Sequence, residues 1–165
     1  MPEPFHILIL CTGNSARSIL AEAAFNHLGG GRVRAQSAGS RPTGKPHPLA
    51  LGLLAGKGID TGFARSKSWD EFAGPLAPRM DLVITVCDSA AAEDCPFWPG
   101  APLRAHWGLP DPAAVSGSDA ERAAAFARTW SALERRVRAF LDLPFETLGA
   151  PALKLHLGAI GTAPD

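Results

Sequence analysis

Tyrosine is absent from this sequence, cysteine occurs only three times, and neither sign of charge is in excess. Three cysteines are too few, and odd in number, for a scaffold held together by disulfides. Sixteen acidic residues balance sixteen basic ones, so the net charge offers no attraction to nucleic acid or to an anionic membrane. No apolar run approaches the roughly 20 residues of a membrane span, and the first residues lack the features of a secretory signal. We therefore expect a cytoplasmic protein with no nucleic-acid or membrane partner.

Apolar residues make up 46% of the 165 residues, which is enough for a proper core. Short apolar runs typical of buried strands alternate with amphipathic helical segments. This alternation predicts an α/β fold with a mainly parallel sheet, in which ligands collect at the carboxyl ends of the strands. We expect strands at 5–10, 32–36, 81–86 and 103–107, and helices at 18–28, at 49–57 and after residue 118.

The last long helix carries the clearest local signals. Ser118 and Glu121 form a capping box, and apolar residues recur behind them at helical spacing. We expect these apolar residues in the core: Phe126, Trp130, Leu133, Val137 and Phe140. We assign residues 1–143 to the main domain and residues 144–165 to a C-terminal extension that packs on the body or on a neighbouring subunit.

The strongest functional signal is CTGNSARS, residues 11–18, which lies between an expected buried strand and an expected helix. A tight loop that leads into a helix N-terminus offers backbone N–H groups and a positive dipole to an anion. Arg17 can hold two oxygens of that anion in a bidentate fork. The same positive environment should lower the pKa of Cys11 and make it a nucleophilic thiolate. The expected oxyanion loop consists of Cys11 followed by Thr12, Gly13, Asn14, Ser15, Ala16, Arg17 and Ser18.

This loop resembles the phosphate loop of the low-molecular-weight protein tyrosine phosphatases and of the arsenate reductases built on their fold. The resemblance implies a single three-layer domain with a four-stranded sheet. It also implies that Cys11 is the nucleophile, that Arg17 binds the oxyanion, and that Asn14 and Ser18 support the loop. Asp111, in HWGLPDPA, corresponds to the general acid of the family, which protonates the departing oxygen.

The other two cysteines separate two functions. A phosphatase hydrolyses a phosphocysteine, whereas an arsenate reductase needs a second thiolate to attack Cys11 and a third to carry the disulfide onward. Cys87 follows an expected strand, Cys95 lies eight positions later, and C-D-x6-C-P followed by HWG-x2-DPA is similar to the three-cysteine arsenate reductases. The lack of tyrosine also fits poorly with tyrosine phosphatases of this fold, which commonly place aromatic residues beside the acid. We favour a reductase with a Cys11/Cys87/Cys95 relay over a phosphomonoesterase.

Three further expectations concern cofactors and partners. Some reductases of this family hold potassium behind the loop, and Asn14, Glu22 and Ser37 match three of the ligands, but Lys67 stands where an acid would be expected. The lysine ammonium could replace the ion, so we expect no bound metal or cofactor. The substrate would be arsenate or phosphate, and the reductant thioredoxin or glutathione with glutaredoxin, a choice that stays open. A non-enzymatic oxyanion-binding domain is disfavoured because Arg17 and Asp111 are both present.

Overall fold

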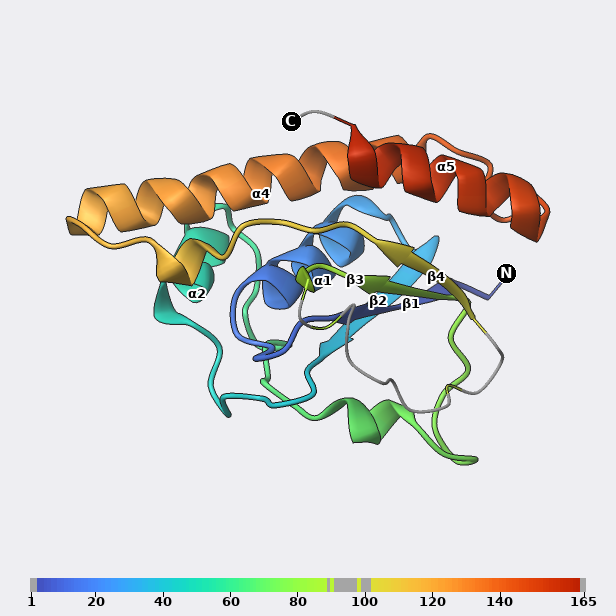
Figure 1. Ribbon diagram of the computed structural model, residues 1–165, viewed down its shortest axis with the longest axis horizontal. Coiled ribbons are helices and arrows are strands. Elements are labelled where there is room, and N and C mark those ends of the chain that lie inside the picture. Colours follow the sequence, from blue (N-terminus) through green and yellow to red (C-terminus); the bar gives the residue numbers. More distant parts are fainter. Residues whose placement is uncertain (1–2, 89, 91–97, 99–101, 164–165) are drawn as a thin grey trace.

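The computed structural model describes residues 3–88, 90, 98 and 102–163. Their strands form one four-stranded parallel sheet in the order β2-β1-β3-β4 (Figure 1). The apolar runs FHILIL and LVIT form the two inner strands, where both faces of the sheet are covered. The bounds are β1 (Phe5–Leu10), β2 (Val33–Ala38), β3 (Leu82–Thr85) and β4 (Leu103–His106).

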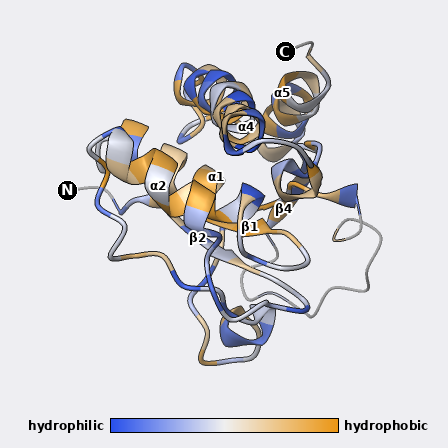
Figure 2. Cartoon of the chain, turned by 90° about the vertical axis from the view of Figure 1, so that its left-hand side faces the viewer, coloured by the Kyte–Doolittle hydropathy of each residue, from blue (hydrophilic) through white to orange (hydrophobic). Residues whose placement is uncertain are grey.

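Helices cover one face of this sheet, and a layer with little regular structure covers the other (Figures 1 and 2). Ile7 and Ile9 of β1 point into the larger core beneath the helices, while Leu8 and Leu10 contribute to a smaller core on the opposite face. The third layer includes the 3-10 helix η1 (Trp69–Phe72), whose Phe72 is buried in the smaller core. The helices are α1 (Arg17–Leu28), α2 (Pro48–Gly56), α4 (Asp119–Leu141) and α5 (Ala150–Thr162).

The expected α/β fold with a parallel, four-stranded sheet is confirmed, and every expected strand and helix is present within two residues of its expected ends. The capping box at the start of α4 is also confirmed, since Ser118 and Glu121 each bond the other's backbone. The five apolar residues of this helix that were expected in the protein core are all buried. Among the described residues, the helices are each too short or too polar to cross a membrane.

The C-terminal segment folds as α5, which contacts α4 and the edge strand β4. Its buried residues are Leu153 and Leu157. The indole Nε1 of Trp107, just after β4, donates a hydrogen bond to the carbonyl oxygen of Leu157 at 3.1 Å. This helix therefore packs on the same body as the sheet, beside the chain that leaves β4.

Candidate active site

The oxyanion loop connects β1 to α1, with Cys11 directly after the strand and Arg17 as the first residue of the helix. Asn14 has a positive φ of 46°, a backbone conformation that asparagine tolerates better than most residues. Its amide group is fully buried and donates to Ser18 Oγ at 2.8 Å and to Ser37 Oγ at 3.0 Å. The same side chain accepts a hydrogen bond from the backbone of Lys67 at 2.9 Å. Asn14 thus fixes the strained turn of the loop from inside.

The chain after β2 supports the loop from a second side, which the sequence interpretation did not foresee. Three backbone N–H groups, from Arg41, Thr43 and His47, donate to carbonyl oxygens of the loop at 2.8–3.0 Å. Gly39 approaches so closely that a Cβ atom there would lie 2.4 Å from the carbonyl oxygen of Thr12. The Gly- and Pro-rich composition of 39–48 was the available signal that this segment lies against other backbone.

Arg17 links the loop to the chain that follows β4. Its Nη1 donates to the carbonyl oxygen of Leu109 at 2.9 Å, and its Nη2 lies 3.8 Å from Asp111 Oδ2. Among the described residues, its buried Nε has no hydrogen-bond acceptor. The guanidinium is therefore held in place by one edge and retains a buried donor for an oxyanion.

Asp111 begins the short 3-10 helix η2 (Pro112–Ala114), where its Oδ1 accepts a hydrogen bond from the backbone of Ala113 at 3.0 Å. The other oxygen faces Arg17, and the side chain is 43% exposed. The carboxyl group is thus oriented toward the loop and remains accessible to solvent. These are the two requirements for an acid that must be protonated again after each turnover.

Cys11 and Cys87 are free thiols that lie together at the carboxyl ends of β1 and β3. The sulfur of Cys87 accepts backbone hydrogen bonds from Thr12 at 3.3 Å and from Ala90 at 3.4 Å. A hydrogen bond from Cys11, with these backbone donors, lowers the pKa of Cys87 to about 5 despite its burial. That same hydrogen bond and burial raise the pKa of Cys11, against the effect of Arg17. The influences on the pKa of Cys11 thus oppose one another, and a nucleophilic thiolate at Cys11 stays a prediction.

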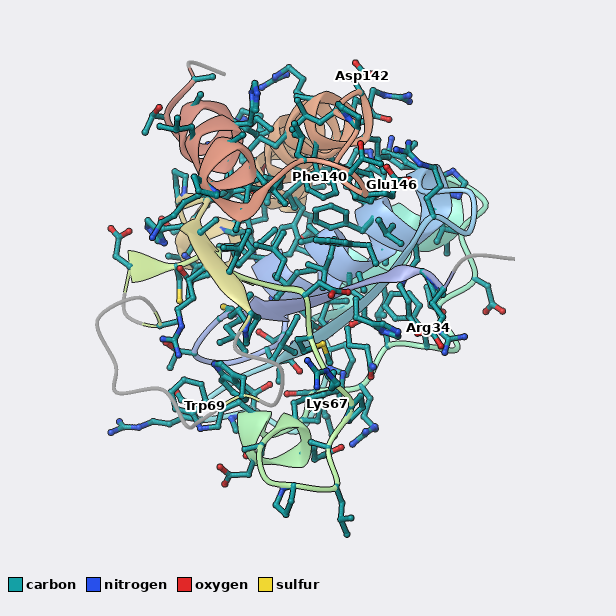
Figure 3. All side chains as sticks on the ribbon, turned by 90° about the vertical axis from the view of Figure 1, so that its right-hand side faces the viewer. Arg34, Lys67, Trp69, Phe140, Asp142 and Glu146 are labelled. Carbon is teal, nitrogen blue, oxygen red and sulfur yellow. The ribbon has the colours of Figure 1, made fainter. Side chains whose placement is uncertain are left out.

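Lys67 lies behind the loop, on the side of the sheet where η1 is found (Figure 3). Its Nζ is 3.9 Å from Glu22 Oε1, and both side chains are almost completely buried, at 6% and 7% exposure. Ser37 Oγ donates a hydrogen bond to the same carboxylate oxygen. Burial raises the pKa of Glu22 and lowers that of Lys67, and in each case the partner's charge opposes the shift. The structure thus brings Lys67 together with Glu22, Ser37 and Asn14, the residues that the sequence grouped around a cation.

Cys95 lies outside the described residues. The last residues of β3 and β4, together with Asp88, form a further network that the sequence interpretation missed. His106 Nε2 lies 2.8 Å from Asp88 Oδ1, and its Nδ1 lies 2.7 Å from Thr85 Oγ1. Since Asp88 follows Cys87 directly, this network ties the thiol-bearing chain to the end of β4.

Comparison with known proteins agrees with this geometry. The family described as low molecular weight phosphotyrosine protein phosphatase matches residues 6–151, and the chain belongs to that family. The chain is 36% identical to an arsenate reductase of Halalkalibacterium halodurans over 136 residues. The aligned region covers 82% of this chain and 94% of that protein.

Solved structures with the same fold include two further arsenate reductases. The structure of the enzyme from Archaeoglobus fulgidus has a TM-score of 0.64 and 26% identity, over 83% of this chain and 99% of that one. A thioredoxin-dependent arsenate reductase from Corynebacterium glutamicum has a TM-score of 0.59 and 25% identity, over 84% of this chain and 61% of that one. The relatives thus combine a phosphatase fold with a reductase activity.

Proposed function

We propose that this protein reduces arsenate to arsenite, with Cys11 as the nucleophile in the oxyanion loop. The observation that carries the proposal is the second thiol, Cys87, which contacts Cys11 and has backbone donors directed at its sulfur. Hydrolysis of a phosphocysteine has no use for such a thiolate, whereas reduction of arsenate requires one. The arsenate reductase names of the relatives support the same choice.

In the first step, the sulfur of Cys11 attacks arsenic, so that a sulfur–arsenic bond forms and one arsenic–oxygen bond breaks. Arg17 and the backbone N–H groups of the loop hold the remaining oxygens. Asp111 protonates the departing oxygen, which leaves as water, and the proton lost from Cys11 balances the one delivered by Asp111. Arsenic remains in the +5 state throughout this step, which is equivalent to the first step of a phosphatase.

In the second step, the thiolate of Cys87 attacks the sulfur of Cys11. A disulfide forms, the sulfur–arsenic bond breaks, and its electron pair stays on arsenic, which leaves as arsenite in the +3 state. Two thiols have supplied the two electrons. In the adduct the sulfur of Cys11 has no proton to donate, so the backbone N–H groups of Thr12 and Ala90 are the donors that stabilise the attacking thiolate of Cys87.

In the third step, we assign Cys95 as the thiol that attacks Cys87, releases Cys11 and forms a Cys87–Cys95 disulfide. An external dithiol of the thioredoxin or glutaredoxin type would then reduce this disulfide. The role of Cys95 rests on the sequence pattern alone. A thioredoxin-type reductant is favoured by the thioredoxin dependence of the enzyme from Corynebacterium glutamicum.

No metal or cofactor takes part in this proposal. The ammonium group of Lys67 lies beside Glu22 behind the loop and supplies a positive charge where a bound potassium ion would supply it. Because Asn14 connects this ion pair to the turn of the loop, the pair would support the oxyanion site without an exchangeable ion.

The test separates the two halves of the reaction. Replacing Cys87 by serine should abolish arsenite formation with any reductant, while hydrolysis of para-nitrophenyl phosphate persists, because oxyanion attack needs only Cys11. Replacing Cys11 by serine should abolish both activities and leave the fold intact. A wild-type enzyme that hydrolyses the aryl phosphate but forms no arsenite with thioredoxin or glutaredoxin would favour the phosphatase function instead.

A further inference from the structure

We propose that α5, through its contacts with Trp107, positions the chain segment that carries the catalytic acid. This inference rests on the proposed role of Asp111 as general acid. The family match ends at residue 151, so almost all of α5 lies beyond it. In Figure 3 the ribbon of α5 lies directly above β4, the strand from which the acid-bearing segment 107–111 departs. The helix therefore contacts the origin of that segment.

Trp107 is the residue through which α5 acts. Its side chain is fully buried between two helices. On one side, its indole ring stacks on Phe25 of α1, with ring centroids 5.8 Å apart. On the other side, its Nε1 donates to the carbonyl oxygen of Leu157 of α5 at 3.1 Å. A buried indole N–H needs such an acceptor, so the position of α5 determines where the tryptophan can lie.

The approach of α5 is close enough to require a glycine. A Cβ atom at Gly161 would lie 2.6 Å from the carbonyl oxygen of His106 and 2.8 Å from Cδ1 of Trp107. Backbone and a packed ring cannot yield as the end of a flexible side chain can. Gly158 lies three residues earlier in the same helix, and outside that helix no atom of the described residues would lie within 4 Å of a Cβ atom there. The two glycines therefore differ in the neighbours of their missing side chains.

Arg136 of α4 holds the same segment from behind. Its buried Nη1 donates to the carbonyl oxygens of Trp107 at 3.0 Å and of Gly108 at 3.2 Å. The next residue, Leu109, donates its backbone N–H to Val86 and accepts the hydrogen bond of Arg17. A displacement that begins at Trp107 thus reaches, within two residues, the carbonyl group that orients Arg17.

From Leu109 to the acid the chain has little freedom to absorb a displacement. Pro110 and Pro112 flank Asp111 and restrict the backbone on both sides. Asp111 lies 3.8 Å from Arg17 and must place a proton on one particular oxygen. Since a misplacement of about 1 Å can cost on the order of a hundredfold in rate, a small shift of Trp107 should be visible in the acid-dependent step.

The experiment compares Gly161→Ala with Gly158→Ala in the full chain. For each variant, kcat/KM is measured with para-nitrophenyl phosphate, whose leaving group hardly needs protonation, and with phenyl phosphate, whose leaving group needs it. We expect Gly161→Ala to lower kcat/KM for phenyl phosphate at least tenfold more than for para-nitrophenyl phosphate. The inhibition constant of inorganic phosphate measures any accompanying change at Arg17, which contacts Leu109, and it should rise by a smaller factor than the loss with phenyl phosphate. Gly158→Ala should match the wild type in all three measurements.

A second variant guards against a simple loss of folding. Trp107→Phe keeps an aromatic ring but removes the donor to Leu157, so it should reproduce the selective loss with phenyl phosphate while far-UV circular dichroism stays that of the wild type. Equal losses with both substrates, or no loss in either variant, would overturn the inference. Arsenite formation by the wild type is measured separately, so failure of the reductase proposal is distinguishable from failure of this one.

Discussion

The buried ion pair behind the loop leads to a quantitative prediction. Replacing Lys67 by methionine keeps most of the apolar stem of the side chain, removes the ammonium group and leaves the carboxylate of Glu22 buried without its cation. Removing one partner of a buried pair costs about 3–5 kcal/mol. We therefore expect the free energy of unfolding of Lys67→Met at pH 7 to fall by an amount in that range. Urea titration followed by tryptophan fluorescence measures it.

A matched control lies two residues away. Arg65 forms a shorter and bidentate pair with Glu71, at 2.7 and 2.9 Å, but these side chains are 60% and 44% exposed. Because water screens an exposed pair, Arg65→Met should cost about 0–1 kcal/mol. Distance alone predicts the opposite order, with the 2.7 Å pair more important than the 3.9 Å pair. Equal losses in the two variants would refute the argument from burial.

The pH dependence gives a second check on Lys67→Met. Burial raises the pKa of Glu22 above its ordinary 4.5, and the charge of Lys67 is the main influence that limits the rise. Without Lys67 the pKa in the folded state rises further, so the folded protein binds a proton that the unfolded chain has released. The free energy of unfolding of the variant must then fall, relative to wild type, as pH increases above 4.5. The deficit should be small near pH 4 and reach its full size once the pH exceeds the pKa of the folded state.

The same variant tests the role of the ammonium group as an internal cation. Wild-type activity should be the same in potassium, sodium and choline chloride at equal ionic strength. Lys67→Met should lose activity in choline and regain part of it in potassium, because removal of the ammonium group uncovers the carboxylate and hydroxyl oxygens of Glu22 and Ser37. The double variant Glu22→Gln/Lys67→Met should recover most of the stability but show no response to potassium. Severalfold activation of the wild type by potassium would contradict the proposal.

Three further predictions concern the catalytic groups. Asp111→Asn should lower the rate of arsenate reduction by on the order of 10²–10⁴-fold, with a smaller loss for para-nitrophenyl phosphate; equal losses would mean that Asp111 only positions its segment. Thiolate absorbance at 240 nm should titrate near pH 5 in the reduced wild type. In Cys87→Ser that transition should vanish. Cys11 should then ionise at lower pH than in wild type, because the hydrogen bond with Cys87, the main cause of its raised pKa, is gone. Cys95→Ser should stop after one turnover with a Cys11–Cys87 disulfide that peptide mass spectrometry can locate, whereas a variant that keeps turning over would exclude Cys95 from the relay.

The fold could be predicted because its signals are local. The runs 5–10 and 82–85 are continuous apolar strands, and Ser118 with Glu121 marks the start of α4 within one residue. The positions of Cys11 and Arg17 could also be predicted, because strand, loop and helix follow one another in the chain around them; the catalytic roles of Cys11, Arg17 and Asp111 stay predictions. What the sequence could not provide was the charge state of a pair of thiols 76 residues apart. That state depends on the distance between the two sulfurs and on which backbone groups face each of them.

Long-range backbone contacts escaped the sequence interpretation for a similar reason. The hydrogen bond from Arg17 to the carbonyl oxygen of Leu109 joins residues 92 positions apart. Because every residue has a backbone carbonyl group, the residue types in the sequence do not indicate which carbonyl accepts this bond. Lys67 was an exception. Its grouping with Glu22 and Ser37 was expected from a resemblance, and the structure shows that the three are close. The function of that group remains a prediction until the potassium experiment is done.

The contact between Gly39 and the loop has a consequence for protein engineering. Attempts to broaden the range of oxyanions would naturally randomise residues 12–16, which make up most of the proposed oxyanion loop. Yet the outer wall of the loop is the backbone at Gly39, where the first carbon of any side chain would lie 2.4 Å from the carbonyl oxygen of Thr12. A library that also varies position 39 would consist largely of proteins in which the loop has been pushed inward. Keeping glycine there, and varying instead the outward-facing residues of 40–47, is the design that leaves the loop free to be reshaped.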